Sequence, residues 1–289
     1  MKQSAAINHA RLTVLLPVKN YHPSYLQQSV ASVIGQSAGD WRLLVIAEPH
    51  DQTHFESVLH GALGDARTRL IANQGRKLAG AINTGMRHAE TDFVALLLAD
   101  DLWATDAVAV LASYIGRYPE VDFFHTSRRV IDENGTPISS VHHSRPHFTL
   151  DDFKRGSPVK HLLCWRTSTG LAIGGLDESL NSVGPDDYDF PWMMAEHGAR
   201  FKAVSECLYY YRDHRDAYRL TTHLPLSVHK SECQRIFKKH GVPWRERRRY
   251  VTRAQRGFLR QCLYRNGIDR WIKERFGYDA RRGWRETYR

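Results

Sequence analysis

Short apolar runs alternate with longer amphipathic stretches over the first 125 residues of the chain. Runs that are apolar at almost every position are typical of strands buried on both faces, and they occupy residues 12–18, 41–47, 68–73, 92–99 and 121–125. Stretches in which apolar residues recur every three or four positions predict helices, and they occupy residues 23–36, 51–63, 77–89 and 105–118. This alternation predicts an α/β fold in which a mostly parallel sheet carries helices on both faces.

The alternation ends after residue 125. Residues 132–137 have the composition of a turn, and residues 141–158 are polar and typical of a loop. An aromatic strand is predicted within residues 207–219, where it leads into a charged loop. We therefore predict one α/β domain over residues 1–220, with two halves that meet near residue 125, followed by a separate helical region over residues 221–289.

The net positive charge of the chain comes from its C-terminal region. Lys and Arg outnumber Asp and Glu by 41 to 31, and residues 243–289 hold 15 of the basic residues against 5 acidic ones. Arginines interleave with apolar residues at helical spacing there, which predicts basic amphipathic helices. Such helices bind anionic membrane surfaces, but the apolar stripe could equally pack on the domain or form a dimer interface. Nucleic-acid binding is disfavoured because no recognised nucleic-acid module is present.

The composition excludes several classes of protein. The longest apolar run, FVALLLA, is far shorter than the roughly 20 residues that cross a bilayer, and the first residues lack the apolar segment of a signal peptide. The cysteines form no CxxC pair, so a structural zinc site and a disulfide framework are not expected, and a reducing cytoplasm fits best; they are Cys164, Cys207, Cys233 and Cys262.

Carboxylates follow two of the predicted strands directly. Asp100 and Asp101 end the run LLLADD, and Glu48 follows residues 41–47. In parallel sheets, ligands bind beside the carboxyl ends of the strands. Carboxylates at that edge suit a divalent cation bound by oxygen ligands and by the phosphates of a substrate. Helix capping and solvated surface acids are the alternative interpretation of the same residues.

Several segments, in their order along the chain, resemble the inverting family 2 glycosyltransferases with the Rossmann-like GT-A fold. They span most of residues 12–215 and read LTVLLPVKN, SVASVIGQ, LAGAINTGMRHAETDFVALLLADD, IGGLDESL, GPDDYDFPWMMAEHG and YYYRDHRD. The resemblance implies a hexosyltransferase that moves a sugar from a nucleotide-diphosphate donor, foremost a UDP-sugar, to an acceptor hydroxyl with inversion. It also implies that residues up to about 125 bind the donor and that residues 126–220 bind the acceptor.

The resemblance further implies roles for residues near the donor. Asp101 takes the position of a ligand to Mn²⁺ or Mg²⁺, and Asp100 takes that of a contact to the donor ribose. Pro17 and Val18 lie where the family binds the nucleoside, and Glu48 lies where an acid reads the base. The remaining candidates are Lys77 and Asn83 in a donor-facing helix, Arg212 and Arg219 as phosphate contacts, and His214 near the metal. A solvated lysine and a polar helix residue are equally good interpretations of Lys77 and Asn83.

Inverting transfer needs a carboxylate that accepts the proton of the acceptor hydroxyl as its oxygen attacks the anomeric carbon. The segment GPDDYDF supplies Asp186, Asp187 and Asp189. By the resemblance, Asp187 is the predicted base and Asp186 its neighbour, and the alternative is that one of them only caps the following helix. Trp165 and Trp192 are candidates for stacking on a sugar, with core packing as the alternative.

Two departures from the family pattern leave the choice of base and sugar open. Leu98 stands where many members carry a further Asp, and the turn after the second strand reads AEPHD. A non-catalytic protein that binds a sugar nucleotide or a glycan on the same fold is therefore the competing hypothesis. For the enzyme, the expected acceptor is a glycan or a lipid-linked glycan used to build a cell-surface polysaccharide, with possible contact to the inner face of the membrane.

Overall fold

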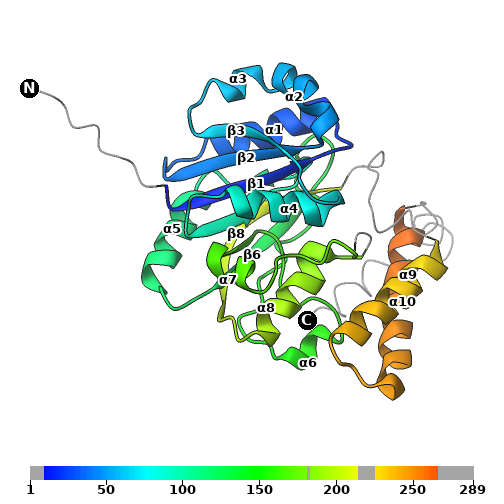
Figure 1. Ribbon diagram of the computed structural model, residues 1–289. Coiled ribbons are helices and arrows are strands. Elements are labelled where there is room, and N and C mark those ends of the chain that lie inside the picture. Colours follow the sequence, from blue (N-terminus) through cyan, green and yellow to red (C-terminus); the bar gives the residue numbers. More distant parts are fainter. Residues whose placement is uncertain (1–9, 181–182, 214–224, 266–289) are drawn as a thin grey trace, which may run out of the picture. The chain divides into compact units, whose positions relative to one another are not determined.

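The computed structural model describes residues 10–180, 183–213 and 225–265 (Figure 1). The chain forms two compact units, one of residues 1–153 and 157–214 and one of residues 154–156 and 215–289. We call the first the sheet unit and the second the helical unit.

The sheet unit contains a mixed sheet whose described strands follow the order β3-β2-β1-β4-β7-β6-β8-β5. Strands β3, β2, β1 and β4 are parallel to one another, and β6 is parallel to β8. The β4–β7, β6–β7 and β5–β8 pairs are antiparallel. The strands are β1 (Leu12–Val18), β2 (Trp41–Ala47), β3 (Thr68–Ala72), β4 (Phe93–Leu96), β5 (Leu102–Trp103), β6 (Phe123–Ile131), β7 (Leu163–Arg166) and β8 (Phe201–Arg212). The predicted α/β class is confirmed, and its parallel part is the first half of the domain.

Helices cover both faces of this sheet, which explains why the strands are apolar without interruption. On β1, Val14 and Leu16 pack with α1 on one face, whereas Leu15 packs with α4 on the other. Figure 1 shows α1 and α4 on opposite sides of β1 and β2. The helices of this unit are α1 (Pro23–Ile34), η1 (Pro49–Asp51), α2 (Gln52–Val58), α3 (His60–Leu63), α4 (Lys77–His88), α5 (Ala107–Arg117), α6 (Leu150–Phe153), α7 (Thr167–Ala172), η2 (Pro185–Asp189) and α8 (Phe190–Glu196).

Several elements differ from the prediction. The segment 141–158, expected to be a loop, contains the short helix α6, and the strand expected over residues 92–99 is confined to Phe93–Leu96. The single helix expected over residues 51–63 is divided between η1, α2 and α3. Strand β6 runs six residues beyond the expected end at residue 125, because its second half pairs with the aromatic part of β8. The two-residue strand β5 was not expected at all. It follows Asp101 directly and pairs with Tyr209 and Tyr210 of β8.

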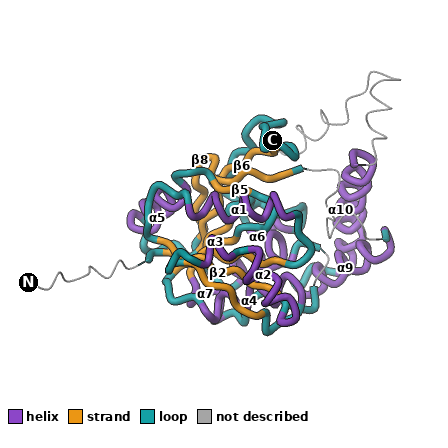
Figure 2. The backbone as a smooth tube through the Cα atoms, turned by 90° about the horizontal axis from the view of Figure 1, so that it is seen from above, coloured by secondary structure: helices purple, strands orange, loops and turns teal. Residues whose placement is uncertain are grey.

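The helical unit is built on α9 (Leu226–Lys239) and α10 (Trp244–Arg265), which lie side by side in Figures 1 and 2. The rings of His229 and Phe258 stack 4.2 Å apart, and those of Phe237 and Tyr250 lie 5.9 Å apart, so the two helices are antiparallel. The second amphipathic stretch expected in the tail lies beyond residue 265 and outside the described residues. Among the helices that are described, none combines the length and the apolar character needed to cross a bilayer.

Candidate active site

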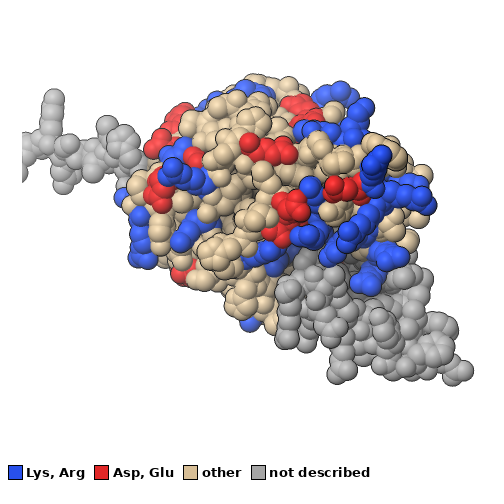
Figure 3. Space-filling model, turned by 90° about the horizontal axis from the view of Figure 1, so that it is seen from below, with Lys and Arg blue, Asp and Glu red and all other residues tan. Residues whose placement is uncertain are grey.

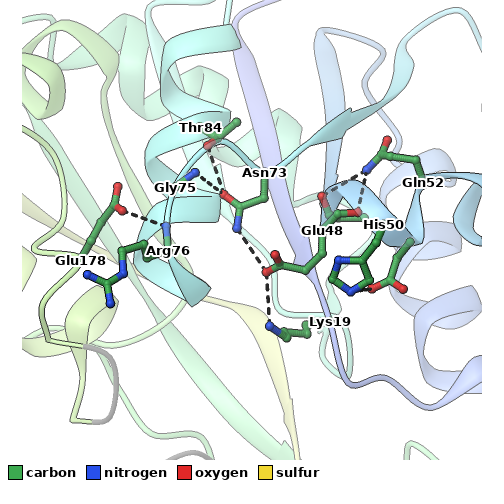
Figure 4. A network of polar contacts seen from close by, with 11 residues as sticks. Lys19, Glu48, His50, Gln52, Asn73, Gly75, Arg76, Thr84 and Glu178 are labelled. Carbon is green, nitrogen blue, oxygen red and sulfur yellow. Dashed lines mark hydrogen bonds and ion pairs between the residues drawn. The ribbon is translucent and has the colours of Figure 1, made fainter.

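The carboxyl ends of β1, β2 and β3 bring together one polar side chain each (Figure 4). Lys19 follows β1, Glu48 follows β2 and Asn73 follows β3. The Lys19 Nζ atom lies 3.4 Å from the Glu48 Oε1 atom, and the Asn73 Nδ2 group donates to the same oxygen at 3.3 Å. The Glu48 side chain keeps 18% of its surface exposed. Glu48 is thus held at the expected edge, beside the last residues of β1, Pro17 and Val18, with surface left for a ligand.

Asn73 was not singled out from the sequence, although it directly follows the third strand. Its Oδ1 atom accepts hydrogen bonds from the Gly75 N–H at 2.9 Å and from the Thr84 hydroxyl at 3.3 Å. Gly75 lies against Gly80 of α4, and a Cβ atom on Gly75 would lie only 2.6 Å from the Gly80 Cα atom. Asn73 and the two glycines therefore fold the loop after β3 tightly onto the start of α4.

Lys77 is the first residue of α4 and lies at this same edge. It has a φ of 56°, in the left-handed region that a non-glycine residue seldom adopts. Its side chain is exposed. A lysine at a helix N-terminus presents its ammonium beside backbone N–H groups that also favour anions. This placement suits the predicted phosphate contact, which stays a prediction.

Asn83 does not fit the predicted donor contact. Its Nδ2 group donates to the Leu176 carbonyl at 2.9 Å and to Glu178 Oε1 at 3.1 Å, and its Oδ1 atom accepts from the Leu176 N–H at 2.8 Å. Only 5% of its surface is exposed. Both of its amide donors and its carbonyl oxygen are therefore engaged within the protein, and Asn83 holds the loop of residues 176–178 onto α4.

The two adjacent aspartates after β4 have opposite surroundings. Asp101 has no exposed surface. Its Oδ2 atom accepts a hydrogen bond from the Tyr209 hydroxyl at 2.6 Å, and its Oδ1 atom accepts one from the Arg212 backbone N–H at 2.7 Å. Burial, and secondly the charge of Asp100, raise the pKa of Asp101 to about 7. Asp100 is partly exposed at the edge of the sheet.

Arg212 forms its hydrogen bonds within the protein and therefore does not fit the predicted phosphate contact. It is fully buried, and its guanidinium donates to the Asp100 carbonyl at 2.8 Å and to Gln28 Oε1 at 2.7 Å. Further bonds reach the carbonyls of Asp132 at 3.3 Å and Glu133 at 2.9 Å. With its donors used in this way, Arg212 fixes the backbone that presents Asp100 and Asp101.

The surroundings of Asp100 and Asp101 change which of the two is the better candidate for a metal ligand. A carboxylate with no exposed surface and with a hydrogen bond on each oxygen does not fit the role predicted for Asp101. The partly exposed Asp100 fits better, because Mg²⁺ and Mn²⁺ commonly take one or two carboxylates and fill their remaining positions with water and phosphate oxygens. Among the described residues, no group of three or more His, Cys, Asp and Glu side chains lies close enough to hold a metal ion. His214 and Arg219 lie outside the described residues.

Replacing Asp101 by alanine is expected to lower the free energy of unfolding by about 3 kcal/mol, because it leaves the Tyr209 hydroxyl and the Arg212 N–H buried without an acceptor and each such group costs about 1–3 kcal/mol. Tyr209→Phe leaves the buried Asp101 Oδ2 atom without its donor and should cost about 1–3 kcal/mol. Urea unfolding followed by circular dichroism measures both, with the exposed Asp106→Asn as a control. An Asp101→Ala protein of unchanged stability that no longer binds metal would restore the assignment made from the sequence.

The acceptor-side carboxylates lie on η2, after Gly184, whose φ is 49°. Asp186 is 8% exposed, and its Oδ2 atom lies 3.2 Å from His161 Nε2, which is also buried. Asp187 is partly exposed. Burial and then the charge of Asp186 raise the pKa of Asp187, while the positive charges of His161 and Arg128 act in the opposite direction. Asp187 is thus a partly exposed carboxylate with an increased proton affinity, as a general base requires.

His161 was missed in the sequence, where it is one of 16 histidines. Burial, the largest single effect, lowers the pKa of His161, but the hydrogen bond with Asp186 and the negative charges of Asp186 and Asp187 together outweigh it, so the net shift is upward. The ring of His161 also lies 5.3 Å from that of Tyr209, whose hydroxyl binds Asp101. A continuous row of buried side chains therefore joins the donor-side aspartates to Asp186.

Both candidate sugar-stacking residues belong to the core. Trp165 is 1% exposed, and its indole N–H donates to the Met86 sulfur at 3.1 Å. Trp192 is 2% exposed and stacks on Phe153 at a ring distance of 5.6 Å. Of the two interpretations of these residues, core packing is the one that fits.

The sequence model described as Glycosyl transferase family 2 matches residues 13–169, which is more than half of the 289 residues. The chain belongs to this family. Among solved structures, Staphylococcus aureus TarS 1–349 in complex with UDP-GlcNAc superposes with a TM-score of 0.63 at 16% identity, covering 96% of this chain and 79% of that one. The shared architecture confirms the predicted GT-A fold.

Curated relatives of this family 2 chain include one protein named for O-antigen biosynthesis and others named as glycosyltransferases. The O-antigen biosynthesis protein RfbC of Myxococcus xanthus is 27% identical over 208 residues, which are 70% of this chain and 16% of that protein. The UDP-Glc:alpha-D-GlcNAc-diphosphoundecaprenol beta-1,3-glucosyltransferase WfgD of Escherichia coli is 27% identical over 125 residues, 43% of this chain and 47% of WfgD. The putative glycosyltransferase EpsE of Bacillus subtilis is 24% identical over 212 residues, 72% of this chain and 75% of EpsE. The chain thus spans less than half the length of RfbC and of WfgD.

Proposed function

We propose that this protein is a metal-dependent inverting glycosyltransferase that moves a sugar from a nucleotide diphosphate, most simply a UDP-sugar, to an acceptor hydroxyl. The observation that supports this most strongly is the presence of two sets of carboxylates, one at the carboxyl edge of the parallel strands and one on η2, joined by the row of Asp101, Tyr209, His161 and Asp186. A protein that only binds a sugar nucleotide would have use for the first set alone.

The donor occupies the edge formed by β1, β2 and β4. Glu48 accepts from the N–H groups of the base next to Pro17 and Val18, and Lys77 meets the diphosphate. The carboxylate of Asp100 would hold the cation, while Asp101 and Arg212 fix the backbone that carries Asp100. A bound Mn²⁺ or Mg²⁺ would supply positive charge that neutralises the diphosphate leaving group.

The acceptor binds on the η2 side of the domain. Asp187 accepts the proton of the attacking hydroxyl, and the oxygen forms its bond to the anomeric carbon on the face opposite the diphosphate, so the configuration inverts. His161 orients Asp186 and places a positive charge near Asp187. That charge limits the rise in the pKa of Asp187.

The acceptor is a glycan or a lipid-linked glycan, and the process is the synthesis of a cell-surface polysaccharide at the inner face of the membrane. The name of the M. xanthus relative refers to O-antigen biosynthesis, and that of the E. coli relative refers to a diphosphoundecaprenol acceptor. A lipid diphosphate acceptor also agrees with the basic character of the C-terminal region.

Thermal stability measured against UDP, GDP, CMP and dTDP, each with and without Mn²⁺, tests the donor class. One nucleotide at 100 times its dissociation constant should stabilise the protein by about 2.7 kcal/mol, and the shift should require the metal. UDP is the expected ligand. If none of the four nucleotides changes the melting temperature, the strand edge is not a donor site and the proposal fails.

A further inference from the structure

Arginines gather in one hollow of the helical unit. The hollow has a volume of about 550 Å³ and is lined by Arg155, Arg245, Arg248, Arg249, Tyr250, Thr252, Arg253 and Arg256. Arg155 comes from the short segment 154–156, which belongs to this unit, and the other residues lie on α10. Figure 3 shows Lys and Arg side chains at several places on the face it draws, most densely at the right. We call this hollow the arginine pocket.

The spacing of the arginines along α10 places them on one face of the helix, where they line the arginine pocket. Residues three and four apart lie on one face of a helix, and Arg245, Arg248, Arg249, Arg253 and Arg256 follow this spacing. The opposite face of α10 is buried against α9 through Val251 and Phe258. The packing of α9 on α10 therefore also directs the arginines of α10 toward the outside of the helical unit.

The five arginines that α10 contributes to the arginine pocket have no acidic partner within the part of the chain that the structure describes. Arg245, Arg248, Arg249, Arg253 and Arg256 are exposed, and none of them lies within 4.0 Å of a carboxylate oxygen of a described residue. Like charges held this close repel one another unless an anion joins them. Guanidinium groups offer paired N–H donors that match two oxygens of one phosphate.

Large apolar side chains are exposed on the same unit. Trp244 is 72% exposed at the start of α10, and Leu259 is 44% exposed near its other end. Leu226 and Val228 at the start of α9 are 42% and 39% exposed. The Leu226 carbonyl accepts from Gln255 at 3.5 Å, so the exposed residues of α9 lie beside the second half of α10. Exposed Trp and Leu next to arginines are typical of a surface that enters the interface of a bilayer.

We infer that the arginine pocket binds the phosphate groups of anionic lipids, and that the exposed apolar residues of α9 and α10 contact the bilayer beside them. The arginines supply the electrostatic attraction, and Trp244, Leu226 and Leu259 supply apolar contact. A nucleic acid would use the same charge, but it would not explain apolar residues exposed around it. This inference is independent of the proposed sugar transfer, because it concerns residues outside the donor and acceptor sites.

Co-sedimentation of the full chain with vesicles tests the inference. One set of vesicles contains phosphatidylcholine alone, and the other also contains phosphatidylglycerol. The pocket variant carries Arg248→Gln, Arg249→Gln and Arg253→Gln, which keep good helix-forming residues on exposed positions. The matched control carries Arg69→Gln, Arg117→Gln and Arg200→Gln, which remove the same charge from exposed positions of the sheet unit. Circular dichroism confirms that both variants are folded.

The wild type and the control should bind the anionic vesicles alike, and the pocket variant about 100-fold more weakly, since each basic residue near the surface contributes about 5-fold. Equal weakening in both variants would overturn the inference, because net charge alone would then explain binding. Equal binding of neutral and anionic vesicles would also overturn it.

Two other ligands would give different results. If inorganic phosphate stabilises the wild type saturably but not the pocket variant, and no vesicles are bound, the pocket binds a soluble phosphate compound instead. Tighter binding to single-stranded DNA than to anionic vesicles would favour a nucleic acid.

Discussion

Asp187→Asn is expected to lower the rate of sugar transfer by about 10²- to 10⁴-fold, the range by which a positioned general base accelerates a reaction. Asparagine has nearly the same shape as aspartate, but its amide cannot accept the proton of the acceptor hydroxyl. Asp187 lies on η2 and not on the strand ends of β1 and β2 that are expected to hold the nucleotide. The nucleotide-dependent thermal shift should therefore remain that of the wild type.

The measurement follows the transfer of labelled sugar to acceptor and, in parallel, the thermal shift with nucleotide and Mn²⁺. Glu120→Gln is a matched control, because it removes one exposed carboxylate that has no part in the proposed mechanism. A wild-type transfer rate in Asp187→Asn would show that another group accepts the proton. Loss of nucleotide binding together with transfer would place Asp187 in the donor site instead.

The pH dependence of transfer supplies a second test of the same residue. Because burial and the charge of Asp186 raise the pKa of Asp187, transfer should decline with falling pH already above the ordinary range of carboxyl groups. The positive charge of His161 lowers the pKa of Asp187, so His161→Gln should move this decline to still higher pH. A pH profile that is unchanged in His161→Gln would contradict the proposed positioning role, even if the variant is less active.

Asp100→Asn is expected to abolish the metal-dependent part of nucleotide binding. The amide is a neutral and weaker ligand for a hard divalent cation than the carboxylate is. Under conditions in which nucleotide with Mn²⁺ stabilises the wild type by about 2.7 kcal/mol, the variant should show no more stabilisation with the metal than without it. Its stability in the absence of ligand should change little, because the side chain of Asp100 is partly exposed.

Thermal unfolding of wild type, Asp100→Asn and Asp106→Asn measures this effect. Asp106 is exposed, precedes α5 and makes no side-chain hydrogen bond to cap it, so its replacement controls for the loss of a nearby charge. A metal-dependent shift that survives in Asp100→Asn but disappears in Asp101→Asn would show that the buried carboxylate turns outward to bind the metal. That result would contradict the division of roles between the two aspartates.

The architecture of the donor half could be predicted because its physical cause is local. A strand buried on both faces must be apolar at every position, so Leu12–Val18 and Trp41–Ala47 are visible in the sequence alone. The parallel arrangement then places the residues after each strand at one edge of the sheet. On this basis the positions of Glu48 and of Asp100 at that edge could be predicted.

The roles of individual side chains depended on partners that are remote in sequence. Asp101 is buried because Tyr209 and Arg212 reach it from 108 and 111 positions farther along the chain. Asn83 is occupied by a loop that lies 93 positions away. From the sequence alone, two adjacent aspartates are equivalent, and an asparagine on a helix is as suited to a ligand as to a distant loop.

The contacts of His161 could not be predicted from the residues next to it in the sequence. It precedes β7, and β7 pairs antiparallel with β4, with Leu163 opposite Leu96. That pairing brings His161 between the end of β4 and η2, where it meets Tyr209 and Asp186. The antiparallel half of the sheet has no strand–helix alternation, so no pattern in the sequence indicated this neighbourhood.

The most direct test of the proposed function is an assay with labelled UDP-sugars and a membrane extract that supplies lipid-linked acceptors. We predict that the wild type moves label from one UDP-sugar into the lipid fraction, that Mn²⁺ or Mg²⁺ is required, and that Asp187→Asn fails although it still binds the nucleotide. A wild type that binds the sugar nucleotide but neither transfers nor hydrolyses it with any extract would contradict the proposed function and identify a binding protein on this fold.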